Sequence, residues 1–174
     1  CGNNMNKKCV ELLKQNGMTV STAESCTGGL IGQMITDVSG ASAVYNMGFI
    51  TYSNEAKMQL LDVPADVIKS HGAVSKETVS YMAKGVRENA KSDIGIGVSG
   101  IAGPNSDGTD KPVGLVYIGF SAKEGDFYLK CLFDKSLGRD GIRKATASKV
   151  FELITLYLTD YERFVKNVKF ANFN

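Results

Sequence analysis

The chain has 174 residues, which is room for one ordinary domain with a sizeable hydrophobic core. Its 43% hydrophobic and 22% charged residues are typical of a soluble globular protein and exclude a disordered or fibrous chain. Twenty Lys and Arg residues against 18 Asp and Glu leave a formal net charge of +2. This near-balance argues against a surface that grips nucleic acid through many phosphates.

The cysteines and the single histidine, His71, show no metal-binding pattern. Cys1, Cys9, Cys26 and Cys131 are scattered without a CxxC pair, which predicts reduced thiols in a cytoplasmic protein with no metal and no cofactor. No apolar run approaches ~18 residues, so no membrane span is expected, and no signal-peptide core follows the N-terminus. Because the chain starts with Cys1, either Met5 is the true start or the domain was excised from a longer chain.

Helices and strands are expected to alternate through the first half of the chain. Apolar spacing predicts a helix over 6–16, a strand over 18–23, a helix over 30–38, a strand over 44–53 and a helix over 55–61. Asn54 is predicted to be the N-cap of the last of these helices.

The second half adds a hairpin to this alternation. The pattern predicts a helix from Ser75 to Lys91, a strand over 94–99, a hairpin of 113–121 with 127–133, and a helix over 140–160. Interleaved helices and strands followed by a hairpin indicate an α/β fold, a three-layer α/β/α sandwich with a mixed sheet. We expect a single domain over residues 5–165, preceded by residues 1–4 and followed by a tail, 166–174.

The stretch Ala23–Gly29 lies where a predicted strand end meets a helix start. Such a junction presents backbone N–H groups and the positive end of a helix dipole, which favour an anion or an oxyanion. Ser25 is therefore a candidate nucleophile, although an N-cap followed by a glycine turn also fits the segment. Cys26 is a second candidate, because a helix N-terminus lowers a thiol pKa, but it lacks a partner histidine. Glu24 either orients a base or makes a buried hydrogen bond.

Lys57 is the candidate base, and Tyr52 precedes it by five residues. A lysine at a helix start opposes the helix dipole, and once buried it would lose its proton easily. A solvated lysine is the alternative. The spacing from Tyr52 differs from the four residues found in short-chain dehydrogenases.

Two further patterns carry weaker signals. Residues 95–100 contain G-x-G-x-x-G, but these glycines lie inside an apolar strand, so we reject a dinucleotide site and expect close approach to a neighbouring strand or a ligand. Arg139 and Arg143 open the last helix, where arginines either grip a phosphate or form a solvated face.

Five stretches together resemble the CinA C-terminal domain family, the nicotinamide-nucleotide amidases. They occur in the family's order, span about Met18 to Lys149, and read TAESCTGG at 22–29, GFITYSNEAK at 48–57, HGAVS at 71–75, SGIAGP at 99–104 and KPVG at 111–114. The resemblance implies a cytoplasmic, metal-independent amidase that converts nicotinamide mononucleotide to nicotinate mononucleotide and ammonia. Longer members carry an additional N-terminal pyrophosphatase domain, for which this chain has no room.

The resemblance also implies roles for individual residues. Ser25 matches the family's nucleophile and Lys57 its general base, with Tyr52 beside them to relay a proton or hold Lys57. The candidate oxyanion and substrate-binding residues are Thr27, Gly28, Gly29, Ser99, Gly100, Ala102, Gly103, Arg139 and Arg143. The chain departs from the family pattern at Ser106-Asp107, where a Gly-Gly pair is usual, and at Lys144, where a second arginine is common.

Two function classes therefore remain at the level of sequence. One is a Ser/Lys amidohydrolase acting on a small nucleotide, with no nucleic-acid or membrane partner and forming a homo-oligomer. The other is a non-catalytic nucleotide- or partner-binding module that regulates an enzyme in the competence or DNA-damage response. Ammonia release discriminates between them.

Overall fold

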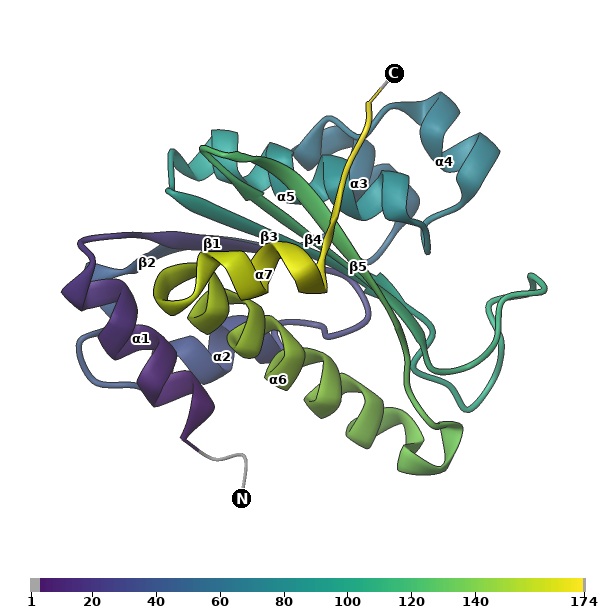
Figure 1. The fold of residues 1–174 in the computed structure, drawn as a ribbon. Helices are drawn as coiled ribbons and strands as arrows, with labels where there is room; N and C mark the ends of the chain where they lie inside the picture. The colour runs from purple at the N-terminus through teal and green to yellow at the C-terminus, as the bar shows by residue number, and fades with distance from the viewer. Residues whose placement is uncertain (1–3, 174) are drawn as a thin grey trace.

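A six-stranded mixed sheet runs through the centre of the computed structural model, which describes residues 4–173 (Figure 1). The strands, in spatial order, are β2 (Tyr45–Ile50), β1 (Val20–Glu24), β3 (Ile94–Gly100), β4 (Leu115–Ala122), β5 (Gly125–Leu132) and β6 (Lys169–Phe170). β2, β1 and β3 are parallel, whereas β4, β5 and β6 continue the sheet antiparallel. The carboxyl ends of the three parallel strands therefore meet at one edge of the sheet.

Helices cover both faces of this sheet, which confirms the three-layer α/β architecture. On one face lie α1 (Met5–Gln15), α2 (Leu30–Thr36), α6 (Gly138–Thr159) and α7 (Tyr161–Asn167). On the other lie α3 (Asn54–Leu61), α4 (Ala65–His71) and α5 (Lys76–Ala90) (Figure 1). Two short 3₁₀ helices, η1 (Ala41–Ala43) and η2 (Lys135–Leu137), complete the described chain.

The glycines of the G-x-G-x-x-G stretch bring α5 close to the sheet. A Cβ built on Gly97 would lie 2.6 Å from the Val79 carbonyl oxygen of α5, and one on Gly95 would meet the Ala83 carbonyl. Gly100 instead faces β4, where a Cβ would lie 2.8 Å from the Leu115 oxygen. The expected close approach to a neighbouring strand thus holds for Gly100, but at the first two glycines the neighbour is a helix, neither a strand nor a ligand.

An aromatic cluster closes the opposite face and anchors the end of the chain. The Phe164 ring of α7 is fully buried, with its centroid 4.7 Å from that of Phe120 and 5.2 Å from that of Phe127. Rings in such tilted contacts contribute about 0.5–1.5 kcal/mol beyond their buried area. The cluster keeps α7 on the sheet and so places β6 beside β5.

The predicted helices and strands are present, with α2 and β2 ending earlier than expected. Five short elements were not predicted: the two 3₁₀ helices, α4, α7 and β6. α4 and α7 have seven residues each and β6 has two, too short for a periodic pattern to mark them. The prediction that Asn54 caps α3 is wrong, because the Ser53 hydroxyl accepts the Ala56 amide at 3.1 Å and Asn54 is the first helical residue.

The two ends of the chain were expected to lie outside the domain. Of residues 1–4, the first three lie outside the described residues, and Asn4 directly precedes α1. The stretch 166–174, expected to be a tail, contains the end of α7 and the paired strand β6. No helix within residues 4–173 is both long enough and apolar enough to span a membrane.

Candidate active site

Three chain segments converge at the carboxyl edge of the parallel strands. Ser25 directly follows β1, Lys57 lies in the first turns of α3 after β2, and the loop 101–103 follows β3. Open α/β sheets bind their ligands outside the carboxyl ends of their strands. Residues that are 32 positions apart in sequence, Ser25 and Lys57, thus face one another.

The Lys57 ammonium nitrogen lies 2.9 Å from the Ser25 hydroxyl oxygen. Lys57 Nζ also donates to the Thr51 carbonyl at 2.7 Å and reaches the Tyr52 carbonyl at 3.3 Å. Every acceptor around the nitrogen is an uncharged oxygen, and none is a carboxylate. The site is therefore built around hydrogen bonding to the amine rather than around a salt bridge.

Burial shapes the chemistry of this lysine. The side chain of Lys57 is only 1% exposed, which is rare for a lysine without an ion-pair partner. Burial disfavours the charged form and lowers the pKa of Lys57 to about 8, from an ordinary value of 10.5. Near physiological pH, far more of Lys57 is therefore a neutral amine than of an ordinary lysine, and a general base requires the neutral form.

Buried Glu24 holds the turn that carries Ser25. Its carboxylate accepts the Thr27 hydroxyl at 2.7 Å and the backbone amides of Ile31 and Gly32 at 3.0 and 2.9 Å. These amides belong to the first turn of α2, where a negative charge is favourable. Of the two roles expected for Glu24, the structure shows the buried hydrogen bonds; no contact links its carboxylate to Lys57.

Thr27, Gly28 and Gly29 form this turn but do not line the cleft beside Ser25. The Gly28 amide donates to the Ser25 carbonyl at 3.0 Å, and Thr27 is fully buried. Gly28 and Gly29 adopt φ values of +59° and +103°, which an L side chain rarely adopts. Their structural role is thus to let the chain turn sharply from β1 into α2.

The cleft itself has a volume of about 260 Å³ and opens above the serine–lysine pair. One wall is the segment Ser99–Gly103, which includes the expected residues Ser99, Gly100, Ala102 and Gly103. Within the described residues, the amides of Ala102 and Gly103 donate to no backbone or side-chain acceptor. These two N–H groups belong to residues that line the cleft and, with that of Cys26 on the serine turn, are candidate donors for an oxyanion.

The two arginines expected to bind substrate differ in position. Arg139 lines the cleft, where its guanidinium donates to the Gly103 carbonyl and lies 3.1 Å from the Tyr52 hydroxyl. Arg143 instead donates to the Thr27 carbonyl at 2.6 Å, behind the serine turn. Of the two arginines, Arg139 therefore lies in the cleft wall, whereas Arg143 holds the turn.

Tyr52 and Cys26 both line the cleft, but neither side chain forms a hydrogen bond with Lys57. The Tyr52 ring is 63% exposed and its hydroxyl pairs with Arg139; only its backbone carbonyl reaches Lys57. Burial raises the pKa of the Cys26 thiol to about 12. The expectation that the helix N-terminus activates this thiol is therefore wrong, since desolvation outweighs the dipole.

Several lining residues were not predicted from sequence. Ala73 and Val74 form part of the cleft wall, and so do Asn105, Ser106 and Asp107. Asp107 accepts the Thr109 amide at 3.0 Å, which shapes the loop at the point where the sequence departs from the family pattern. Val74 could have been predicted to line the cleft, because it lies in the HGAVS stretch at 71–75 that matches the family pattern. Within residues 4–173, no group of three or more His, Cys, Asp or Glu side chains is arranged to hold a metal ion.

These features define an α/β sandwich with a buried serine–lysine pair at the carboxyl edge of its parallel strands. The CinA C-terminal domain family matches residues 2–158, and the chain belongs to this family. A competence-damage inducible protein of Caldanaerobacter subterraneus subsp. tengcongensis is 47% identical over 154 residues, which cover 88% of this chain and 37% of that protein. A CinA-like protein of Geobacter sulfurreducens is 44% identical over 145 residues, covering 83% and 35%.

Solved structures share the fold over nearly the whole chain. The competence/damage inducible protein CihA from Agrobacterium tumefaciens has a TM-score of 0.85 at 36% identity, covering 91% of this chain and 96% of its own. A CinA superfamily protein from Klebsiella pneumoniae has a TM-score of 0.87 at 26% identity, covering 91% and 98%. The chain spans little more than a third of the length of the curated relatives described above.

Proposed function

We propose that this domain is a cytoplasmic amidohydrolase that converts nicotinamide mononucleotide to nicotinate mononucleotide and ammonia. The observation that carries the proposal is the 2.9 Å contact between a fully buried, carboxylate-free lysine and a serine hydroxyl at the strand edge. A serine–lysine pair is an established variant of nucleophile-plus-base catalysis. The substrate class comes from the family resemblance of the sequence, and the geometry supports the reaction type.

The contacts of Lys57 suit a neutral amine. A neutral lysine keeps two N–H donors and one lone pair, and the Thr51 and Tyr52 carbonyls accept two donors. The lone pair then faces the Ser25 hydroxyl and takes its proton as Oγ attacks the amide carbon. The negative charge moves to the amide oxygen, where the amides of Cys26, Ala102 and Gly103 are available to stabilise it.

The second half of the reaction returns each group to its starting state. Protonated Lys57 gives its proton to the leaving nitrogen, the C–N bond breaks, ammonia departs, and an ester to Ser25 remains. Lys57 then takes a proton from water, whose oxygen attacks the ester. The bond to Ser25 Oγ breaks, the carboxylic acid leaves, and Lys57 returns its proton to the Ser25 oxygen. Arg139, at the mouth of the cleft, is the proposed partner of the substrate phosphate, because a guanidinium binds phosphate in bidentate geometry.

An ammonia-release assay across a panel of pyridine compounds tests this function. We expect turnover of nicotinamide mononucleotide, slower turnover of the unphosphorylated riboside, and none in the Ser25→Ala variant. The regulatory-module alternative predicts binding of a nucleotide without ammonia from any compound. Ammonia release that persists in Ser25→Ala would exclude the serine mechanism. Homo-oligomer formation and cytoplasmic location remain predictions from the sequence.

A further inference from the structure

A second cavity, of about 600 Å³, lies on the α5 side of the sheet; it shares Val74 with the catalytic cleft but is lined by neither member of the serine–lysine pair. Its walls come from the segment before α5 and that helix's first turn, from strands β4 and β5, and from the end of α7 with β6. We call it the basic groove, because five lysines from four separate parts of the chain line it: Lys76, Lys111, Lys130, Lys166 and Lys169.

The basic groove concentrates positive charge in a chain that is otherwise nearly balanced. Its five lysines face one carboxylate, Glu77, which leaves four positive charges where the whole chain has a net charge of +2. Among the ion pairs formed by the described residues, none involves these five lysines. Like charges brought together in this way repel one another, so an anion that enters the groove is stabilised.

Two of the lysines are held in place by the structure around them. Lys111 Nζ donates to the His71 carbonyl at 2.8 Å and to the Val74 carbonyl at 2.6 Å, so its charge is fixed at the groove wall. Lys76 Nζ lies over the Tyr128 ring, 5.7 Å from its centroid. Lys130, Lys166 and Lys169 are exposed and free to turn toward an anion.

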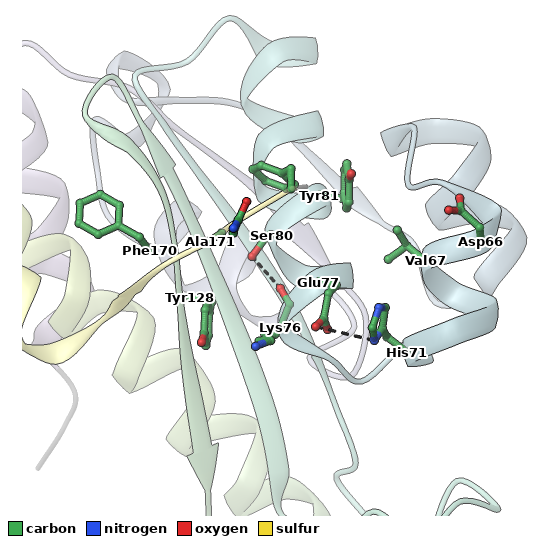
Figure 2. Close-up of a pocket in the computed structure, with 12 residues that line it drawn as sticks. Asp66, Val67, His71, Lys76, Glu77, Ser80, Tyr81, Tyr128, Phe170 and Ala171 are labelled. Carbon is green, nitrogen blue, oxygen red and sulfur yellow. Dashed lines mark hydrogen bonds and ion pairs between the residues drawn. The ribbon is translucent and has the colours of Figure 1, made fainter.

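Aromatic surface accompanies the charge. Tyr117 and Tyr128, on adjacent strands, both line the groove. A cavity of about 300 Å³ adjoins it and shares Tyr128, Lys76, Glu77 and His71 with it (Figure 2). Figure 2 shows Tyr128 of β5 and Lys76 of α5 facing the same space between the sheet and the helix. Flat π-systems stack on such rings, so the groove suits a ligand that joins phosphates to an aromatic base.

We propose that the basic groove is a nucleotide-binding site separate from the catalytic cleft. The lysines hold the phosphates, and the tyrosine rings contact the base. The proposal does not depend on the amidase activity, because the groove contains neither Ser25 nor Lys57. A nucleotide is favoured over a long nucleic acid, because the positive charge is confined to one cavity and is not spread along a surface.

Isothermal titration of the whole chain with adenosine diphosphate, without metal, tests the site. We expect saturable one-to-one binding that weakens at least tenfold in the double variant Lys166→Glu, Lys169→Glu. The control, Lys7→Glu with Lys8→Glu, makes the same change in charge at two exposed lysines of α1 on the opposite face and should alter the affinity less than threefold. All four side chains are exposed, and thermal melting checks that both variants fold; Lys166→Gln with Lys169→Gln replaces the first pair if it does not.

Two further binding measurements show whether the nucleotide binds in the basic groove or in the cleft, and how much its base contributes beside its phosphates. Arg139→Ala alters the catalytic cleft and should leave the affinity for adenosine diphosphate within twofold. Inorganic pyrophosphate should bind about fivefold more weakly than adenosine diphosphate, because it has no ring to contact Tyr117 and Tyr128. The proposal is overturned by no measurable binding at millimolar nucleotide, by equal losses in the two double variants, by loss in Arg139→Ala, or by binding of duplex DNA alone.

Discussion

Lysine side chains have opposite environments in the two cavities of this domain, buried in one and exposed in the other. In the catalytic cleft, Lys57 is 1% exposed and surrounded by uncharged oxygens, so burial lowers its pKa to about 8. In the basic groove, Lys130, Lys166 and Lys169 are exposed to water, which hydrates an ammonium well. One residue type is therefore proposed to act as a base where it is desolvated and to bind an anion where it is not.

The difference follows from where each lysine lies in the fold. Lys57 projects from the start of α3 into a space closed by β1 and the chain after β2. The groove lysines lie on strands, at helix ends and, for Lys111, in the loop before β4. The packing around each lysine side chain thus sets its proposed role. A substitution that keeps the positive charge but removes the basic amine should impair the cleft and spare the groove.

The largest effect is expected from Ser25→Ala, which removes the proposed nucleophile. Ammonia release should fall by about 10³-fold or more, because residual catalysis rests on the oxyanion donors and substrate binding alone. The fold and the affinity for substrate should persist, since the small side chain contributes chemistry rather than packing. Single-turnover assays with calorimetry measure both quantities.

The neighbouring thiol provides the matched control. Cys26→Ala should retain activity within a few-fold, because burial raises the pKa of this thiol to about 12 and keeps it protonated. A loss in Cys26→Ala with activity retained in Ser25→Ala would reverse the assignment of the nucleophile.

Lys57→Arg sharpens the comparison between the two kinds of lysine. We expect it to lose about 10²- to 10⁴-fold in turnover, nearly as much as Lys57→Ala, because arginine keeps the charge but does not give up its proton. An anion-binding lysine would behave differently, since arginine binds phosphate and carboxylate at least as well. Lys7→Arg, on the outer surface of α1, controls for the substitution itself. Turnover of Lys57→Arg within a few-fold of the unaltered chain would leave Lys57 as an electrostatic anchor.

The pH dependence of turnover tests the lowered pKa directly. Because the base is the neutral form of Lys57, kcat/KM should rise about tenfold per pH unit below pH 8 and level off above it. A lysine with its ordinary pKa of 10.5 would give a rise that continues well beyond pH 9. Initial rates between pH 6 and 10, in buffers of constant ionic strength, distinguish the two profiles.

The central part of the site could be predicted from the sequence because it depends on strand ends. Ser25 follows a strand pattern, Lys57 follows the next, and parallel strands bring such positions to one edge. The Ser99–Gly103 segment, which lines the cleft, was instead named through the family resemblance. The α/β layering followed from the alternation of periods along the chain.

What could not be predicted depends on packing between distant segments. The glycine pattern at 95–100 gave no sign that Gly95 and Gly97 lie against helix α5. Nor did the sequence around Glu24 show that its carboxylate accepts amides from the first turn of α2. The rule that a helix start lowers a thiol pKa failed at Cys26, since burial could not be judged from neighbours in sequence. The basic groove gathers lysines from four regions between residues 76 and 169, so no local motif marks it.

The smallest effect is expected from Tyr52→Phe, which tests whether this exposed side chain belongs to the base or to the binding of substrate. The Tyr52 carbonyl, which reaches Lys57 at 3.3 Å, survives the substitution, whereas the hydroxyl contact with Arg139 at 3.1 Å is lost. A net hydrogen bond is worth about 0.5–1.5 kcal/mol, so KM should rise about two- to tenfold as Arg139 loses one of its two hydrogen-bond partners.

The turnover number of this variant should stay within twofold of that of the unaltered chain at pH 9, where Lys57 is largely neutral. The proton-relay role that the resemblance allows for Tyr52 gives the opposite pattern, a fall in kcat of about 10²-fold or more with KM unchanged. Tyr161→Phe on α7 removes a comparable exposed hydroxyl far from the cleft and should change neither constant. Steady-state ammonia release therefore distinguishes the two roles of the Tyr52 hydroxyl. A fall in kcat indicates that it relays a proton, whereas a rise in KM indicates that it positions Arg139.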